Sequence, residues 1–461
     1  MKKYLFISVF ILLTSMHVLA QSTTVRVATP ENTPEDAPIF MAGTFNDWQP
    51  QDEQYQLLID EDGYYVIVFE TVGHHSFKFT RGGWDKVETN ASGQAIANRQ
   101  FLFGSQDTLT LEIAGWEDLL NGGGTSTASE NVSILSDNFI MPPLNRSRRI
   151  WVYLPPDYDN SIKRYSVLYM HDGQNLFDRA TAFAGEWAVD ESLNELFTQG
   201  FEVPIVIGID NGSAHRIDEY CPWTNSQYGG GEGLEYINFI KDFLKPYVDS
   251  AYRSRPDARH TSIMGSSLGA LVSHFAALTY PEVFGNVGLF SPAFWINPQI
   301  FETSNYQHLS ASQRFYFMAG DKESGRMITD MENAYRILLE HAIPDENIHL
   351  KIVLNGEHNE FLWRTQFKEA IKWLFAETND NNETITQSEM YPVPSAGNLF
   401  FRSVNEKFPN KIEIITLSGQ LVMQIEGIET KQLDVSQLQK SVYIVRISYE
   451  DQILLRRLAI Q

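Results

Sequence analysis

The pentapeptide Gly265-Ser266-Ser267-Leu268-Gly269 has the residue types and spacing of a reactive turn. It lies between a strand-like segment, His260 to Met264, and a helix-like segment that begins near Ala270. A sharp turn from strand to helix needs residues without side chains two positions before and two positions after its central residue. The pattern therefore predicts that Ser267 is held exposed on a strained turn as a nucleophile.

A serine hydroxyl becomes a good nucleophile only when an imidazole accepts its proton and a carboxylate orients that imidazole. In turns of this kind both groups follow the serine along the chain. Only one later histidine follows an apolar strand-like run, "LKIVLNGEH", in a loop from which it can reach the turn. This histidine, His358, is the predicted base, and the other later histidines are His274, His308, His341 and His349.

The orienting carboxylate should follow the strand-like segment "RFYFMAG". Three acidic residues are available there, namely Asp321, Glu323 and, farther on, Asp330. Asp321 is closest to the end of the strand, whereas Glu323 has the longer side chain. The spacing alone leaves the choice between these two residues open.

Attack by the serine would place negative charge on a substrate oxygen, which then needs two fixed hydrogen-bond donors. The backbone N–H of Leu268, directly after the nucleophile, is one candidate. The second should follow an earlier strand, and the backbone N–H of Gln174 in "VLYMHDGQNLFD" is the candidate there. A metal pair at His171 and Asp172 lacks a third ligand at suitable spacing, so we expect no metal and no other cofactor.

Apolar runs without polar alternation mark the part of the chain between residues 133 and 377 and indicate strands covered on both faces. They alternate with helix-like segments such as "EYINFIKDFLKPYVDSAY" and "DMENAYRILLEHA", which have apolar residues at three- and four-residue spacing. We therefore predict a doubly wound sheet of the α/β-hydrolase type, with the site beyond the carboxyl ends of its strands. The strand-like runs include "RIWVYLP", "SVLYMHDG", "PIVIGID", "TSIMG", "VGLFSP", "RFYFMAG" and "IHLKIVLNG".

Residues 21–115 show short segments of period two, which predict a small antiparallel β sandwich. Asp62 and Gly63 mark a hairpin turn, and the acidic run from Asp60 to Asp62 lacks the spaced oxygens of a calcium loop. The stretch 116–132, which contains "NGGGTSTAS", is predicted to be a flexible linker.

The first 20 residues have two lysines, an apolar run and small residues before a cleavage point, as in a secretory signal peptide. No other segment is apolar enough to cross a bilayer, so we expect no transmembrane segment after removal of this signal. The single cysteine, Cys221, cannot form an intramolecular disulfide and is interpreted as a buried apolar residue. The formal charge of −23 and the pI near 4.9 argue against nucleic acid as a partner and favour uncharged ester substrates.

The segment from Arg146 to Phe375 resembles the esterase D-like family, which includes feruloyl and acetyl xylan esterases, enterochelin esterases and mycolyltransferases. The resemblance rests on "RRIWVYLPPDY", "VLYMHDGQNLFD", "EWAVDE", "IMGSSLGAL", "MAGDKES" and "NGEHNEFLW". In that family the acid falls three residues beyond the glycine that ends its strand. The resemblance therefore implies Glu323 rather than Asp321 as the acid, although Asp is common where this chain has Glu.

The sandwich resembles family 48 carbohydrate-binding and early-set domains through "FMAGTFNDWQP" and "HSFKFTRGGWDKVE". In such modules exposed aromatic residues stack on sugar rings, which makes Trp48 and Trp84 the candidate glycan-binding residues. Trp48 could instead close the core of the sandwich, and many such domains bind no glycan and only pack on the enzyme.

After a second linker, 378–390, residues 391–461 resemble the C-terminal sorting domain of the type IX secretion system, which implies a small C-terminal β-sandwich domain. The resemblance rests on "YPVPSAGNLFF", "IEIITLSGQLV" and "LDVSQLQKSVYIVRI". Val393 stands where the usual opening has Asn, and the usual Gly before Tyr443 is absent. The resemblance implies the type IX machinery as a partner and a location on the cell surface or in the medium.

Together these features predict a secreted serine carboxylic-ester hydrolase that acts through an acyl-enzyme on feruloyl or acetyl groups of polysaccharides. One alternative is a siderophore esterase of the enterochelin type, and another is a surface glycan-binding protein whose esterase domain has decayed. The sequence does not set acyl specificity, because the pocket walls come from loops such as 182–187 and 213–228.

Overall fold

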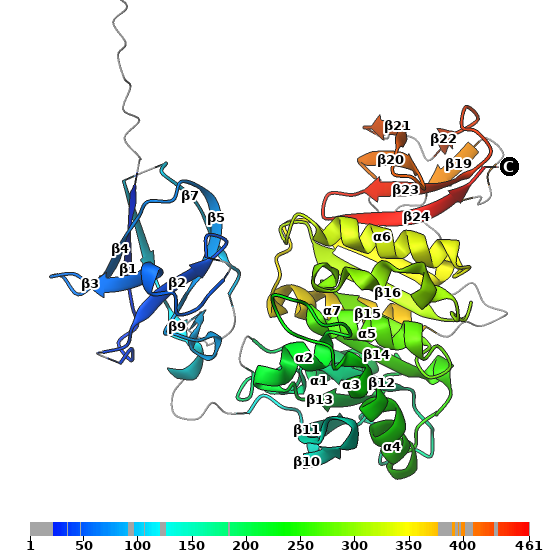
Figure 1. The fold of residues 1–461 in the computed structure, drawn as a ribbon, viewed down its shortest axis with the longest axis horizontal. Coiled ribbons are helices and arrows are strands. Elements are labelled where there is room, and N and C mark those ends of the chain that lie inside the picture. Colours follow the sequence, from blue (N-terminus) through cyan, green and yellow to red (C-terminus); the bar gives the residue numbers. More distant parts are fainter. Residues whose placement is uncertain are drawn as a thin grey trace, which may run out of the picture. The chain divides into compact units, whose positions relative to one another are not determined.

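The computed structural model forms two compact units, Met1–Leu120 and Asn121–Gln461 (Figure 1). The expected signal peptide, Met1–Ala20, and most of the second linker, 378–390, lie outside the described residues. The described residues are 22–34, 36–46, 48–90, 96–105, 107–119, 126–182, 185–376, 390–391, 395, 398–401, 409–427 and 432–460.

The first unit is a β domain whose main sheet has the strand order β7-β5-β2-β3-β4-β1-β8. Its core contains Val25, Phe77, Phe79 and Trp116, which are almost completely buried. The alternation of buried and half-buried residues along β1 is the period-two pattern that the sequence shows. The strands are β1 Thr23–Ala28, β2 Ile39–Gly43, β3 Gln56–Ile59, β4 Tyr65–Phe69, β5 Gly73–Thr80, β6 Glu88–Thr89, β7 Arg99–Phe103, β8 Thr108–Glu112 and β9 Gly115–Trp116.

The turn predicted at Asp62 and Gly63 joins β3 to β4, and Gly63 has a φ of 84° that suits glycine. The Asp60 side chain accepts hydrogen bonds from the backbone N–H groups of Asp62 and Tyr64, at 3.0 and 2.9 Å. Arg26 pairs with both Asp60 and Asp62, at 3.0 and 2.6 Å. The acidic run thus shapes a turn, as the sequence predicts.

The second unit contains the predicted doubly wound sheet, with strand order β10-β11-β13-β12-β14-β15-β16-β17 in its hydrolase part. Strands β13, β12, β14, β15, β16 and β17 are parallel to one another. Strand β11 is antiparallel to β13, and β10 is antiparallel to β11. The bounds are β10 Val132–Met141, β11 Arg146–Tyr153, β12 Val167–His171, β13 Ile205–Ile209, β14 Thr261–Ser266, β15 Asn286–Phe290, β16 Arg314–Gly320 and β17 Ile348–Val353.

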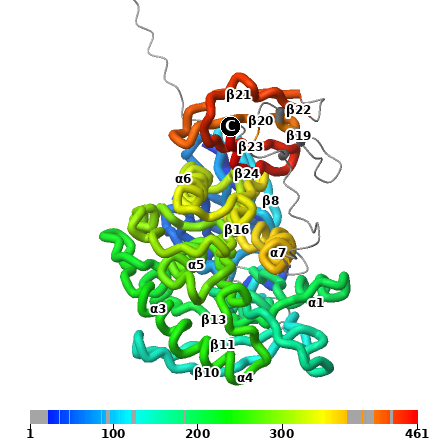
Figure 2. Tube along the Cα trace, turned by 90° about the vertical axis from the view of Figure 1, so that its right-hand side faces the viewer, coloured from blue at the N-terminus to red at the C-terminus, as the bar shows by residue number. Residues whose placement is uncertain are grey.

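Helices cover both faces of this sheet, which explains its uninterrupted apolar strands. Within β12, Tyr169 joins the core under α3, α5 and α6, while Leu168 and Met170 join the core under α1 and α7. Figure 2 shows α1 and α7 on one side of the strands and α3 and α5 on the other. The helices are α1 Val189–Thr198, α2 Arg216–Tyr220, α3 Gly233–Phe239, α4 Lys245–Ala251, α5 Leu268–Thr279, α6 Met327–Glu340 and α7 Glu360–Leu374.

The C-terminal strands form two sheets that share a hydrophobic core, as expected of a small β sandwich, and one of these sheets also extends the doubly wound sheet. Strand β24 pairs antiparallel with β17, with Lys351 opposite Leu454 and Val353 opposite Gln452. Strands β23, β20 and β21 follow in order, giving a continuous sheet of 12 strands. An unpaired edge strand exposes N–H and C=O groups, and β24 covers those of β17. Strands β18, β19 and β22 form the second, three-stranded sheet of the tail. The tail strands are β18 Met390–Tyr391, β19 Asn398–Phe401, β20 Lys411–Thr416, β21 Leu421–Glu426, β22 Gln432–Asp434, β23 Val442–Ser448 and β24 Gln452–Ala459.

Candidate active site

Ser267 occupies the sharp turn between β14 and α5. Its backbone has a φ of 56° and a ψ of −118°, a conformation that residues with side chains rarely adopt. Two hydrogen bonds hold it there: the N–H of Ser267 donates to Phe290 O at 2.9 Å, and the N–H of Ala293 donates to Ser267 O at 3.0 Å. The neighbouring strand thus fixes the strained turn that the sequence pattern predicts.

The two glycines of the turn are required because the strand, the helix and β12 meet closely there. A Cβ atom at Gly265 would lie 2.8 Å from the carbonyl carbon of Gly269 and 2.9 Å from Cδ2 of His171. A Cβ atom at Gly269 would lie 3.3 Å from Cβ of His171. Alanine at Gly265 would therefore push α5 away from β14 and displace the serine.

His358 lies in the loop between β17 and α7, directly before Asn359, whose side chain caps α7 by accepting from Leu362 N–H at 3.0 Å. Its Nδ1 hydrogen-bonds to Oε2 of Glu323 at 2.7 Å. The Glu323 side chain is completely buried, whereas 39% of the His358 side chain is exposed. A buried carboxylate thus orients a partly exposed imidazole.

The structure brings Glu323 and not Asp321 to the imidazole. Oε1 of Glu323 accepts from the hydroxyl of Ser291 and from the N–H of Gly320, both at 2.7 Å. Asp321 instead accepts from the backbone N–H of Asn355 at 2.6 Å. Asp330 lies on α6, 3.6 Å from Arg326.

The pKa of His358 is raised above its ordinary value. Burial alone would lower this pKa, but the negative charge of Glu323 and its hydrogen bond to Nδ1 outweigh that effect. The charge of Glu360 adds to the effect of Glu323, whereas the positive charge of Arg216 opposes it. The imidazole is therefore more basic than a free histidine.

A short chain of contacts connects the nucleophile turn to the Glu323–His358 pair. Ser291 follows Phe290, the acceptor of the Ser267 N–H, and it also donates to Glu323. Nε1 of Trp363 donates to Oγ of Ser291 at 2.8 Å, and the Trp363 ring packs edge-on against His358 at 5.1 Å. Among the described residues no hydrogen bond joins Ser267 Oγ to His358, a contact that often tightens only when substrate binds.

The two candidate oxyanion donors lie at the carboxyl ends of the neighbouring strands β12 and β14. Leu268 is the first residue of α5, so its N–H points out of the helix without an intrahelical acceptor. Gln174 lies in a single helical turn, Gly173–Asn175, directly after β12. Asn211 N–H donates to Oε1 of Gln174 at 3.0 Å, and Thr181 Oγ1 donates to its carbonyl at 2.8 Å, so this turn is fixed.

His171 and Asp172 have internal partners. Both ring nitrogens of His171 are used, by Tyr236 OH at 2.8 Å and by Ser273 Oγ at 3.0 Å. Burial lowers the pKa of His171 to about 3, so the ring is neutral. Asp172 accepts two hydrogen bonds from Arg216, at 2.7 and 2.9 Å. Sequence analysis did not find Arg216, because no motif marks it and only the fold brings it to Asp172.

The remaining candidates are structural. His274 is fully buried in α5, and burial lowers its pKa to about 3. The His349 ring stacks on Tyr316 at 4.8 Å. Cys221 is a buried free thiol whose pKa burial raises to about 12, which makes it unreactive at neutral pH.

An exposed aromatic pair near the nucleophile escaped the sequence analysis. Trp295 lies two residues after Ala293, which bonds to the backbone of Ser267. Its ring is edge-on to Tyr228 at 5.5 Å, and the two residues are 40% and 41% exposed. Asn225 ties the two loops together by donating to Ile296 O at 2.7 Å.

In the first unit, the rings of Trp48 and Trp84 lie side by side, with centroids 6.2 Å apart and planes tilted by 41°. Both residues are half-buried, and neither belongs to the core of the domain. The two predicted glycan-binding residues therefore pack against each other outside that core.

Comparison with known proteins identifies two regions. Residues 142–374, just over half of the chain, match the family described as "Putative esterase". Residues 389–461 match the family described as "Secretion system C-terminal sorting domain". This tail indicates export through the type IX system to the cell surface or the medium. In the described part of the chain, no helix is long and apolar enough to cross a membrane.

Three curated proteins are similar to parts of this chain. The uncharacterized protein YbbA of Bacillus subtilis is 27% identical over 243 residues, covering 50% of this chain and 93% of YbbA. The Iron(III) salmochelin esterase of Escherichia coli is 31% identical over 33% of this chain and 34% of its own length. An endo-1,4-beta-xylanase/feruloyl esterase of Xylanibacter ruminicola is 23% identical over 49% of this chain and 29% of its own length.

Among solved structures, the enterochelin esterase of Shigella flexneri matches with a TM-score of 0.48 and 17% identity. The match covers 74% of this chain and 88% of that structure. The family match, together with the hydrolase sheet and its strained serine turn, shows that this chain belongs to the "Putative esterase" family and carries a secretion-system sorting domain at its C-terminus.

Proposed function

We propose that the protein is a serine carboxylic-ester hydrolase that acts through an acyl-enzyme. The observation that carries this proposal is the strained turn at Ser267, linked through Ser291 to the hydrogen-bonded Glu323–His358 pair. In this assignment Ser267 attacks the ester carbonyl, His358 is the base and Glu323 orients it. The backbone N–H groups of Leu268 and Gln174 stabilise the oxyanion.

The reaction proceeds in two steps, acylation of the serine and hydrolysis of the acyl-enzyme. Ser267 Oγ bonds to the acyl carbon and its proton passes to Nε2 of His358, which returns that proton to the departing alcohol as the ester C–O bond breaks. Water then attacks the acyl-serine and gives a proton to His358, and the acid leaves as the imidazole protonates Ser267 again. Because Nδ1 is hydrogen-bonded to Glu323, Nε2 remains free for both transfers.

The pH dependence of kcat/KM tests His358 as the base. Only the neutral imidazole accepts the serine proton, so activity should fall as the pH drops through the pKa of His358. Because Glu323 raises this pKa, the midpoint should lie above the ordinary histidine value of about 6.5. A pH profile with p-nitrophenyl acetate measures it, and Glu323→Gln should move the midpoint down. A midpoint well below 6 would contradict the assignment.

We further propose that the substrates are acyl esters on polysaccharides. The paired rings of Trp48 and Trp84 offer a surface on which sugar rings can stack. The exposed Tyr228–Trp295 pair, whose Trp295 lies two residues after the Ala293 that bonds to the Ser267 backbone, offers an aromatic wall for a feruloyl group. The relative that is named a xylanase and feruloyl esterase supports this substrate class.

A siderophore ester is the second candidate, favoured by the 31% identity to a salmochelin esterase. An assay of product release separates the two candidates, with feruloylated xylan, acetylated xylan and a ferric triscatecholate trilactone as substrates. We expect release of ferulate or acetate at a kcat/KM at least tenfold above that for the trilactone. Preference for the trilactone would overturn the polysaccharide assignment but not the esterase mechanism.

A matched pair of variants tests the aromatic wall in the same assay. Trp295→Ala should raise KM for a feruloyl ester about fivefold, because one aromatic contact contributes about 1 kcal/mol beyond its buried area. Its KM for a short acetyl ester should change little. Tyr247→Ala is the control, since Tyr247 is similarly exposed but packs against Phe139 from helix α4. Equal effects on both esters would show that Trp295 does not bind the acyl group.

A further inference from the structure

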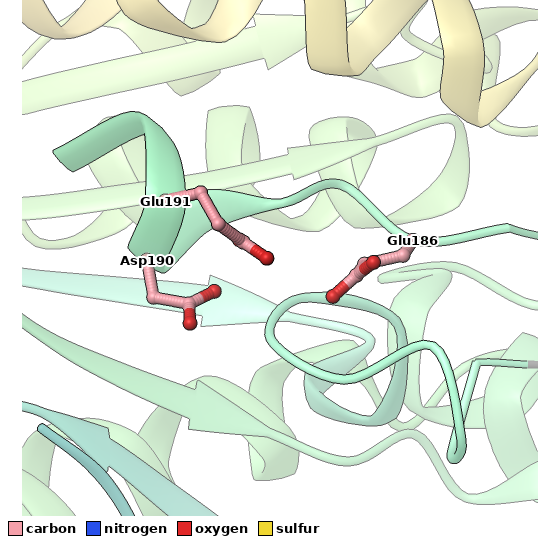
Figure 3. Close-up of side chains that lie close together, drawn as sticks. All are labelled: Glu186, Asp190 and Glu191. Atoms are coloured by element: carbon pink, nitrogen blue, oxygen red, sulfur yellow. The ribbon is translucent and has the colours of Figure 1, made fainter. Parts of the chain in front are cut away.

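Three carboxylates lie together at the start of helix α1, outside the residues of the candidate active site. They belong to Glu186, Asp190 and Glu191, and one oxygen from each lies within 4.8 Å of the others. Figure 3 shows the carboxylates of Glu186 and Glu191 pointing toward one another, with Asp190 beside Glu191 on the first turn of α1. Each oxygen is a hard ligand of the kind that Ca²⁺ prefers.

One oxygen of this cluster is buried without a partner. Asp190 is completely buried, its Oδ2 accepts from the N–H of Ser129 at 2.7 Å, and its Oδ1 has no hydrogen-bond partner. A buried carboxylate oxygen without a donor is costly unless a proton or a cation compensates it. The unpartnered oxygen therefore indicates a bound ligand, which the acidic cluster alone would not indicate.

The protein supplies little positive charge to the cluster. Among the described residues no Lys or Arg forms an ion pair within 4.0 Å of any of the three carboxylates. The N-terminus of α1 contributes only a partial charge, so the repulsion remains largely uncompensated.

We propose that Glu186, Asp190 and Glu191 bind a calcium ion. Three carboxylates can supply three to six oxygens, depending on how many bind through both oxygens, and water can complete the 6–8 ligands of Ca²⁺. Mg²⁺ fits less well, because it demands a small octahedral shell and keeps most of its water. The number and charge of the oxygens thus favour Ca²⁺.

The site would join three segments that are distant in the sequence. Thr127 Oγ1 donates to Glu186 at 2.8 Å, and the N–H of Ser129 donates to Asp190. Residues near the end of the predicted linker, 116–132, therefore bind to the cluster. Trp187, next to Glu186, packs against Trp363 at 5.7 Å, and Trp363 packs against His358. Bound Ca²⁺ would stabilise the support of the catalytic histidine without touching the substrate.

Terbium luminescence and thermal unfolding of the full-length mature protein test the proposal at pH 7.5. Tb³⁺ should show luminescence sensitised by Trp187, and Ca²⁺ should displace it. Ca²⁺ at about 100 times its Kd should raise Tm by about 5 °C, whereas equal Mg²⁺ should have a much smaller effect. Asp190→Asn and Glu191→Gln should each remove both responses.

The control variant is Glu195→Gln on the same helix, where Glu195 pairs with Lys368 at 2.7 Å. It should keep the full Tb³⁺ signal and the Ca²⁺ shift. Glu191 is exposed, so Glu191→Gln remains informative even if Asp190→Asn does not fold. The proposal is overturned if the wild type shows no response, if Glu191→Gln responds like the wild type, or if Mg²⁺ matches Ca²⁺. The first outcome would mean that a shared proton alone compensates the cluster.

Discussion

Replacement of Ser267 by alanine should lower kcat for p-nitrophenyl acetate by at least about 10⁴-fold, because the variant cannot form an acyl-enzyme. The Tm should change little, since the backbone at Ser267 is held by hydrogen bonds to Phe290 and Ala293 that alanine keeps. Loss of activity together with an unchanged Tm would separate a chemical role from a structural one.

Labelling with a fluorophosphonate probe, which reacts with an activated serine, tests the same assignment of Ser267. The wild type and Ser266→Ala should be labelled, because Ser266 ends strand β14 and is buried, whereas Ser267→Ala should not. Full activity in Ser267→Ala would remove the proposed mechanism. A wild-type protein that binds glycan but is neither labelled nor active would instead indicate a decayed esterase domain.

Replacement of Glu323 by glutamine should lower kcat by about 10³- to 10⁴-fold, as expected when an amide replaces the carboxylate that orients the histidine. The imidazolium formed during the reaction would lose its negative partner, and the His358 tautomer would no longer be fixed. KM should change much less than kcat, because Glu323 is completely buried and cannot touch the substrate.

Asp321→Asn is the control for this prediction. Its oxygen can still accept the hydrogen bond from Asn355 N–H, so kcat should stay within about threefold of the wild type and Tm should be nearly unchanged. If Asp321→Asn were the more damaging variant, Asp321 would replace Glu323 as the acid.

The residues that the sequence predicts from local patterns obey local rules. The glycines flanking Ser267 are required wherever a strand turns sharply into a helix, so the spacing alone predicts the turn. The apolar runs predict the doubly wound sheet, because strands covered on both faces have no exposed positions for polar residues. His358 could be singled out because it is the one later histidine that follows such a strand in a loop.

The spacing of the residues left the choice between Glu323 and Asp321 open, the family resemblance implies Glu323, and the structure places the Glu323 side chain at His358. Both residues follow β16 within three positions, and only the direction of each side chain decides which one reaches His358. Ser291, which joins Glu323 to the nucleophile turn, carries no recognisable motif. The spacing of the residues could not reveal these contacts, because hydrogen bonds between different strands depend on how the sheet is assembled.

The sequence by itself determined the strained serine turn, the hydrolase sheet and the sorting tail, because each follows from patterns within one segment. The tertiary structure alone decided that β24 extends the sheet at β17 and that Asp190 is buried against Ser129. It alone decided that Trp295 lies beside Tyr228. The physical reason is that edge pairing, burial and charge compensation arise between segments far apart in the chain, where local spacing holds no information.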